Sequence, residues 1–257
     1  MKAIYMQKKQ CIIDGLRVIY YQSDTFSSDN ALILLHGWGS EAKHLQTVFA
    51  DSKNFLAIDL PGFGQSEVPG TDWTLELYAD FLNKFLNKFD IKDPVLFGHS
   101  FGASIILKYC VKYGRAKKLI LSGAAGIRRQ TNKLKYYKFL AKVAKNILKV
   151  PLIRNYGDSL KQKTYQKIGS LDYLEAGVMK GTYKKVIAED LTNDLDKIKI
   201  PTILFWGEDD QDTPLTDGML MKAKIKGAKL FIIKNAGHFA FIDQSAEFKR
   251  LFIEELI

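Results

Sequence analysis

The stretch PVLFGHSFGASIILKYCVKY, residues 94–113, decides the fold of this chain. It opens with a short apolar run typical of a buried strand and ends in a segment with the pattern of a helix. Between the two lies GHSFG, residues 98–102, a G-x-S-x-G sequence at a strand-to-helix turn. In that setting the serine occupies a tight turn that lifts its hydroxyl above the sheet, and the start of the helix favours negative charge beside it. Ser100 is therefore the candidate nucleophile.

Comparable apolar runs recur on both sides of this turn. They cover residues 31–37, 54–60, 117–123, 201–207 and 229–235. Near-continuous apolar runs suit strands that are buried on both faces of a parallel sheet. Segments with helical spacing separate them, most clearly residues 74–89. The sequence therefore predicts an α/β fold, a mostly parallel, twisted sheet with helices on both faces, whose ligand site lies beyond the carboxyl ends of the strands.

The remaining segments divide the chain into a core and an insertion. Before the first run, the turn signal Asp14-Gly15 predicts a β-hairpin. Residues 124–200 break the alternation, because they hold no comparable strand and show helical spacing. We expect residues 1–123 and 201–257 to form the core, and residues 124–200 to form a helical cap, or lid, inserted between two core strands.

The formal net charge of +10 is concentrated in this insertion. Residues 124–190 hold 15 Lys or Arg and 5 Asp or Glu, so the rest of the chain is close to neutral. The basic face of a predicted amphipathic helix at 133–149 has three interpretations. It is a solvated outer face, a positive lid that steers an anionic small-molecule acyl substrate, or a peripheral contact with an anionic membrane. No nucleic-acid-binding motif accompanies the charge, and the oligomeric state is left open.

Two observations bear on the compartment. Residues 1–15 lack the apolar core of a signal peptide, and no run approaches the roughly 18 apolar residues of a membrane span. Cys11 and Cys110 lie far apart, each beside apolar residues, and are expected to be buried free thiols. These features predict a cytoplasmic protein.

A serine hydroxyl needs a base within hydrogen-bonding reach to become a nucleophile. The chain has four histidines. His99 adjoins Ser100, and its side chain is expected to point away from the serine hydroxyl, whereas His36 and His44 lie near an earlier strand. His238 follows the last predicted strand, where a loop at the carboxyl edge of the sheet can reach the serine. It is the candidate base.

The histidine requires a carboxylate that holds its tautomer and stabilises the imidazolium. The loop after the run 201–207 offers four acids: Glu208, Asp209, Asp210 and Asp212. One of them is expected to orient the histidine, and the others to be solvated or to cap the next helix. The order serine, acid, histidine along the chain separates this arrangement from the two common serine-protease orders.

Taken together, these motifs resemble those of the α/β-hydrolase superfamily, over essentially the whole chain. HGWG (36–39) is similar to its oxyanion loop, DLPGFGQS (59–66) to its D-x-P-G-x-G-x-S segment, GHSFG to its nucleophile elbow, and AGH (236–238) to its histidine element. WGEDDQDTP (206–214) matches the pattern whose aspartate falls on Asp210, so the resemblance implies that Asp210 is the acid. The likeness is greatest to capped serine esterases and to meta-cleavage C–C hydrolases.

The resemblance also implies roles for the surrounding loops. The backbone N–H groups of Trp38 and Phe101 would form the oxyanion hole, where preorganised donors stabilise the negative charge that develops. The residues expected to shape these loops are His36, Gly37, Gly39, Gly98, Gly102 and Asp59. Neither a metal nor an organic cofactor is expected, because the chain has no G-x-x-x-x-G-K-[ST] loop, no complete dinucleotide fingerprint and no Cys/His cluster with metal-binding spacing.

The predicted function is hydrolysis of a small or medium carboxylic ester through an acyl-enzyme on Ser100, as in a carboxylesterase. The same groups serve hydrolysis of a C–C bond, a lactone or a thioester, and a non-hydrolytic lyase on this fold is a further alternative. A ligand-binding protein that retains the fold is the non-enzymatic alternative. Haloalkane dehalogenases and epoxide hydrolases of the superfamily carry an aspartate at the elbow, so the serine argues against both.

Overall fold

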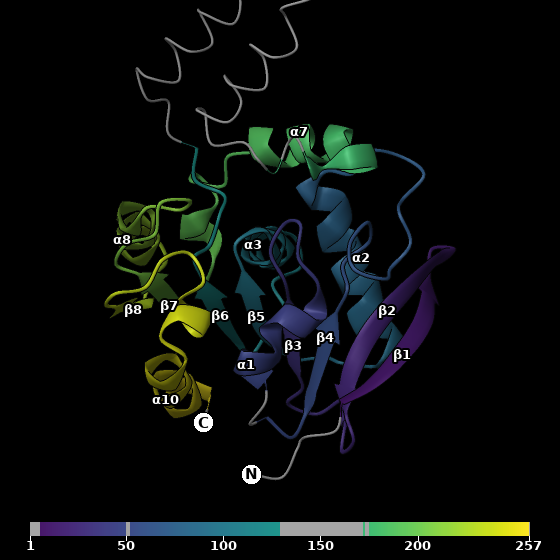
Figure 1. Ribbon diagram of the computed structural model, residues 1–257, viewed down its shortest axis with the longest axis horizontal. Helices are drawn as coiled ribbons and strands as arrows, with labels where there is room; N and C mark the ends of the chain where they lie inside the picture. The colour runs from purple at the N-terminus through teal and green to yellow at the C-terminus, as the bar shows by residue number, and fades with distance from the viewer. Residues whose placement is uncertain (1–5, 50–51, 129–171, 173–174, 257) are drawn as a thin grey trace, which may run out of the picture.

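A computed structural model describes residues 6–49, 52–128, 172 and 175–256 of the chain. Within these residues, eight strands form one sheet in the order β1-β2-β4-β3-β5-β6-β7-β8 (Figure 1). The strands are β1 (Met6–Ile13), β2 (Leu16–Ser23), β3 (Leu32–Leu35), β4 (Phe55–Ile58), β5 (Val95–His99), β6 (Lys118–Ser122), β7 (Thr202–Gly207) and β8 (Lys229–Ile233). β2 runs antiparallel to β1 and β4, and every pairing from β4 across to β8 is parallel. The prediction of a mostly parallel sheet is confirmed.

The antiparallel end of the sheet is the hairpin formed by β1 and β2. Its turn residues Asp14 and Gly15 have φ angles of 51° and 81°, and a two-residue type I′ turn requires positive φ at both positions. Glycine adopts this conformation freely and aspartate tolerates it, so the pair fixes the register in which Ile13 faces Leu16. The predicted hairpin is confirmed, with a first strand that begins at Met6, well before the apolar residues that indicated it.

Alternate residues of the parallel strands pack into two cores, one on each face of the sheet. In β3, Ile33 and Leu35 join one core, and Leu32 and Leu34 join the other. Helices α2 (Leu75–Lys88), α3 (Phe101–Tyr113) and α8 (Leu215–Lys224) cover the first face, and α1 (Gln46–Phe49), α9 (Ala240–Asp243) and α10 (Ser245–Leu256) cover the second (Figure 1). Because both faces are covered, the central strands are mostly apolar, and their polar residues lie at the strand ends. The expected helices on both faces are confirmed, and α2 is the helix predicted at 74–89.

Most of the parallel strands end earlier than the apolar runs that predict them. The run 31–37 contains a strand only at Leu32–Leu35, and His36 already belongs to the loop that follows. The ring of His36 is buried, with Nδ1 donating to the Gly37 carbonyl oxygen at 2.7 Å and Nε2 accepting from the Leu60 N–H at 3.0 Å. Buried loop residues therefore continue the apolar run after the last residue that pairs with a neighbouring strand. For this reason the sequence predicts a strand end that is too late.

The segment between β6 and β7 is described only in part. Its described residues contain no strand, and α7 (Lys180–Ala188) lies across the carboxyl ends of the parallel strands (Figure 1). The short 3-10 turns η3 (Gly177–Met179) and η4 (Leu195–Lys197) precede and follow it. The predicted basic helix at 133–149 lies outside the described residues, so the helical cap at 124–200 stays a prediction.

Close contacts hold α7 against the core. The Thr182 hydroxyl oxygen accepts a hydrogen bond from the Trp73 N–H at 2.9 Å, and the Lys185 ammonium donates to the Asp72 carbonyl oxygen at 2.8 Å. A Cβ at Gly181 would overlap the Asp72 carboxylate, so the helix backbone approaches this loop as closely as glycine allows. The start of α7 is therefore fixed beside the loop that precedes α2.

The two cysteines behave as the sequence predicts. Cys11 and Cys110 are buried and neither forms a disulfide. Burial raises the pKa of the Cys110 thiol, which keeps it protonated and unreactive. As for membrane spans, none of the helices in the described ranges is long and apolar enough to cross a bilayer.

Replacing Gly102 with alanine is expected to destabilise the protein by about 1–3 kcal/mol. A Cβ at this position would lie 2.7 Å from the His36 carbonyl oxygen and would overlap the carbonyl of Leu35, and these backbone atoms cannot move aside as a side chain can. The free energy of unfolding from urea titration measures the effect. Gly70→Ala is the matched control, because nothing lies within 4 Å of a Cβ there. Equal losses of stability in the two variants would contradict the close approach at Gly102.

Candidate active site

Ser100 occupies the sharp turn between β5 and α3. Its φ is 49° and its ψ is −109°, a combination that a non-glycine residue adopts only under strain. The Ser100 N–H donates to the Ser122 carbonyl oxygen at 3.0 Å. The Ser100 carbonyl oxygen in turn accepts from the N–H groups of Ser104 and Ala125, both at 3.2 Å. Strain that is held in place by three backbone hydrogen bonds indicates a functional position.

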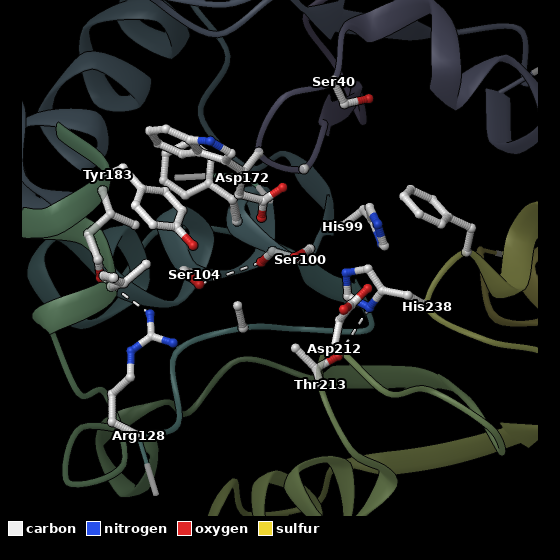
Figure 2. A pocket seen from close by; sticks show the side chains of 17 residues that line it. Ser40, His99, Ser100, Ser104, Arg128, Asp172, Tyr183, Asp212, Thr213 and His238 are labelled. Carbon is white, nitrogen blue, oxygen red and sulfur yellow. Dashed lines mark hydrogen bonds between the residues drawn. The ribbon is translucent and has the colours of Figure 1, made fainter. Parts of the chain in front are cut away.

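His238 lies beside Ser100 in the same pocket (Figure 2). Its Nδ1 is 2.9 Å from Oδ2 of Asp210, whose side chain is fully buried. The ring lies between Ser100 and Thr213, with Nδ1 on the Thr213 side, so Nε2 is turned toward the serine (Figure 2). An Nδ1–H donated to the carboxylate leaves a lone pair on Nε2, the tautomer that a general base requires. The structure thus brings together the three residues that the sequence singled out.

Asp210 accepts four hydrogen bonds. Oδ1 accepts from the N–H groups of Asp212 and Thr213, both at 2.9 Å. Oδ2 accepts from the Thr213 hydroxyl at 2.8 Å as well as from His238. Burial by itself raises the pKa of the Asp210 carboxyl, but the hydrogen bond and charge of His238 and the bonds from Thr213 outweigh it, so the pKa lies below its ordinary value of 3.8. Asp210 therefore stays ionised at neutral pH.

The other acids of this loop are placed differently. Glu208 and Asp209 are exposed, and Asp212 lines the pocket with an exposed side chain. Within the described residues, Asp210 is the one of the four acids that accepts a hydrogen bond from His238. The residues alone left the choice among these four acids open, and the resemblance selected Asp210. The geometry agrees with that selection.

In the part of the chain that the structure describes, one group of side chains has the spacing of a metal site. Ligand atoms of Asp210, Asp212 and His238 lie within 4.8 Å of one another. The four hydrogen bonds to Asp210 already occupy its lone pairs, and one of them comes from Nδ1 of His238. The donors therefore suit an aspartate–histidine pair better than a metal ion.

The predicted oxyanion donors flank the serine. Trp38, in the loop after β3, and Phe101, the first residue of α3, both line the pocket. Within the described part of the chain, neither backbone N–H donates to a protein acceptor, and that of Phe101 belongs to the first turn of a helix, where N–H groups have no intrahelical partner. Gly39 beside Trp38 has a φ of 66°, which glycine adopts without strain. Both N–H groups are thus available to a ligand.

The supporting residues hold these loops in place. Oδ1 of Asp59 accepts from the Ala42 N–H at 2.8 Å, and Oδ2 accepts from the Gln65 N–H at 3.0 Å. Burial lowers the pKa of His36 to about 4, so this ring is neutral and its Nε2 can accept the bond that ties two loops together. A Cβ at Gly98 would lie 2.6 Å from a backbone nitrogen of α3, so the strand and helix meet closely only with glycine there.

His99 packs against the base. Its buried ring lies 4.6 Å from that of His238 and 5.0 Å or less from those of Phe239 and Phe241, measured between ring centres. Nδ1 is 3.1 Å from the Ser122 carbonyl oxygen. Burial, with a smaller contribution from the neighbouring His238, lowers the pKa of His99 to about 3 and keeps the ring neutral. It supports the orientation of the His238 ring.

The pocket above Ser100 has a volume of about 480 Å³. Several of its lining residues were not predicted from the sequence: Ser104, Arg128, Asp172, Tyr183 and Thr213 (Figure 2). Thr213 had a signal, since a hydroxyl three residues after the acid in WGEDDQDTP can return to its carboxylate. The others come from a helix interior or from the insertion, where no motif marks them. Burial raises the pKa of Tyr183 to about 12, so its phenol stays protonated.

Comparison with known proteins gives the family to which this fold belongs. The model of the alpha/beta hydrolase family matches residues 32–251, and the chain belongs to this family of hydrolases. A 2-hydroxy-6-oxononadienedioate/2-hydroxy-6-oxononatrienedioate hydrolase of Burkholderia vietnamiensis is 24% identical over 266 residues, covering 95% of this chain and 92% of the relative.

Two solved structures share the fold over nearly their whole length. An esterase from Exiguobacterium antarcticum is 21% identical, with a TM-score of 0.72 and 99% of each chain covered. A meta-cleavage product hydrolase from Pseudomonas fluorescens is 20% identical, with a TM-score of 0.70 and coverage of 97% of this chain and 98% of the other. These likenesses support the fold class predicted from the sequence.

Proposed function

We propose that the protein hydrolyses small or medium carboxylic esters through an acyl-enzyme formed on Ser100. The observation that carries the proposal is the 2.9 Å contact between Nδ1 of His238 and the buried Asp210, with the serine on the opposite side of the ring (Figure 2). A non-catalytic ligand-binding protein has no need of a strained serine, an oriented histidine and a buried ionised carboxylate together. The arrangement therefore favours an enzyme.

The first half-reaction acylates the serine. Ser100 Oγ attacks the carbonyl carbon of the ester while Nε2 of His238 takes the hydroxyl proton. The carbonyl oxygen becomes an oxyanion that accepts hydrogen bonds from the N–H groups of Trp38 and Phe101. The C–O bond to the alcohol then breaks, and His238 gives its proton to the leaving oxygen. Asp210 remains ionised and stabilises the imidazolium.

The second half-reaction releases the acid. With the alcohol gone, a water molecule attacks the acyl carbon and His238 takes one of its protons. The new oxyanion accepts hydrogen bonds from the same two N–H groups, those of Trp38 and Phe101. When the bond between the acyl carbon and Ser100 Oγ breaks, His238 returns the proton to the serine, and the carboxylic acid leaves. The net reaction consumes one water for each ester.

Hydrolysis of a C–C bond is the second candidate. Two of the matching proteins are named as hydrolases of a 2-hydroxy-6-oxononadienedioate and of a meta-cleavage product. Ser100, supported by His238 and Asp210, can also attack a ketone carbonyl. The carbon that leaves must then be stabilised by a conjugated carbonyl group in the substrate. Simple esters lack that feature, so ester and ketone substrates separate the two activities.

The proposal is tested with p-nitrophenyl esters from acetate to laurate and with a fluorophosphonate probe. We expect the highest kcat/KM for acyl chains of about two to eight carbons, since longer chains exceed a pocket of this size. We expect the probe to label one peptide, the one that contains Ser100. Turnover of a vinylogous diketone without ester turnover would favour the C–C candidate. Tight ligand binding with no labelling and no turnover would favour the non-catalytic alternative.

A further inference from the structure

We propose that Arg128 forms a carboxylate-binding subsite at the acyl end of the pocket. The preferred substrates are then monoesters of dicarboxylic acids, which keep a free carboxylate on the acyl chain. This inference deepens the proposed ester hydrolysis and rests on it. It is carried by a partly buried guanidinium that lines the pocket and has no ion-pair partner in the described part of the chain.

Backbone carbonyl groups hold the guanidinium in place. Arg128 follows the end of β6, and its side chain reaches the wall of the pocket (Figure 2). Nε donates to the Glu189 carbonyl oxygen at 3.1 Å, and Nη2 donates to the Val186 carbonyl oxygen at 3.3 Å. Two of the five N–H donors therefore fix the plane of the group, and no hydrogen bond within the described ranges of the chain occupies the others.

Glu189 and Asp190, two of the three acids whose charges act on Arg128, are engaged elsewhere. The Glu189 carboxylate pairs with the Lys108 ammonium at 2.5 Å. Oδ1 of Asp190 accepts from the N–H and the hydroxyl of Thr192, and more weakly from the backbone N–H of Arg128. Burial lowers the pKa of the Arg128 side chain, although the charge of Asp190 offsets this in part. A cation withdrawn from water and held by neutral carbonyls is stabilised by an anion, and a carboxylate matches its planar, forked geometry.

The charges around the pocket indicate which part of the ester carries the carboxylate. Arg128 and His238 are on opposite sides of Ser100 (Figure 2). The acid at the His238 end is Asp212, whose carboxylate has an oxygen within 4.8 Å of a ring nitrogen of His238 (Figure 2). His238 protonates the leaving alcohol, which places the alcohol at its own end and the acyl chain at the Arg128 end. The carboxylate therefore belongs on the acyl chain and would be repelled on the alcohol.

Ser104 supplies a second donor on the same side. Its hydroxyl lines the pocket and lies 3.5 Å from the Ser100 carbonyl oxygen, at the outer limit of a hydrogen bond. That carbonyl oxygen already accepts two backbone N–H groups, so the Ser104 hydroxyl is available to a ligand oxygen. In Figure 2 Ser104 lies on the Arg128 side of Ser100, where an acyl carboxylate would be bound.

The experiment compares esters whose acyl chains carry a free carboxylate or the same carboxylate masked as a methyl ester. Mono-p-nitrophenyl glutarate carries the acyl carboxylate, and methyl p-nitrophenyl glutarate masks it. We expect the ratio of their kcat/KM values to favour the anion by about 10- to 100-fold, the usual contribution of a hydrogen bond to a charged group. 4-Acetoxybenzoate, which carries its carboxylate on the leaving group, should show no advantage over phenyl acetate.

Variants distinguish a specific effect of Arg128 from an effect of overall charge and from a loss of structure. Arg128→Gln should bring the glutarate ratio close to one, and Arg128→Lys should retain part of it, because lysine keeps the charge but not the fork. Arg250→Gln is the matched control, since this exposed arginine of α10 pairs with Glu254. It should keep the ratio. A merely structural effect of Arg128→Gln would slow both glutarate esters equally and leave the ratio unchanged, which would overturn the assignment.

A binding measurement keeps the subsite testable apart from catalysis. Calorimetry on Ser100→Ala should show that glutarate binds at least about tenfold more weakly once Arg128→Gln is added. Ester turnover with no preference for the anion would overturn the subsite and leave the proposed function intact. Glutarate binding that depends on Arg128 without turnover of any ester would overturn the proposed function and leave the subsite standing.

Discussion

Ser100→Ala is expected to lower kcat/KM for p-nitrophenyl esters by about 10⁵-fold. The substitution removes the oxygen that forms the acyl-enzyme and leaves water as the only nucleophile. The oxyanion donors at Trp38 and Phe101 remain, so a small residual rate above the uncatalysed reaction should persist. Steady-state kinetics measure the loss, and urea unfolding checks that the variant is folded.

Ser40→Ala is the matched control for this loss. Ser40 also lines the pocket, but its hydroxyl lies 2.9 Å from Nδ1 of His44, away from His238. We expect its removal to change kcat/KM by less than about tenfold, because it forms no covalent bond with the acyl group. Comparable losses in the two variants, or a substantial residual activity in Ser100→Ala, would show that another group attacks the ester.

The turn at Ser100 could be predicted because its determinants are local. The glycines at 98 and 102, the strand before the serine and the helix after it lie within one stretch of sequence. His238 could be found because the chain has few histidines. Asp210 was one of four acids in its loop, and only the resemblance selected it. The structure supplies the physical reason, since Asp210 is the buried acid that Thr213 and His238 both contact.

The residues that the sequence missed depend on contacts between distant segments. The Thr213 hydroxyl also lies 3.1 Å from the Gly123 carbonyl oxygen, 90 positions away in the chain. Arg128 gains its place in the pocket from carbonyl groups about sixty positions later, at Val186 and Glu189. Periodicity and motifs carry no information on such pairs. The sequence offered three interpretations of the positive charge of the insertion: a solvated outer face, a steering lid and a membrane contact. It did not single out Arg128, whose guanidinium lines the pocket wall.

Asp210→Asn is expected to lower kcat by about 10⁴-fold while the protein stays folded. The backbone N–H groups of Asp212 and Thr213 both donate to one side of this group, so the amide oxygen of the asparagine must face them. The amide nitrogen then faces His238 and donates to Nδ1. Nδ1 can no longer carry the hydrogen, which moves to Nε2 and leaves the serine without a base. The loss is therefore a consequence of the wrong tautomer as well as of the missing charge.

Asp209→Asn and Asp212→Asn test the same substitution at neighbouring positions. Asp209 is exposed, and Asp212 lines the pocket without a hydrogen bond to His238 within the described residues. Each should change kcat by less than about tenfold, measured at pH 8 with p-nitrophenyl butyrate. The contrast isolates the 2.9 Å contact, because all three variants remove one negative charge from the same loop. If Asp212→Asn caused the larger loss, the charge facing the pocket would be the catalytic one, and the role of the buried pair would have to be structural.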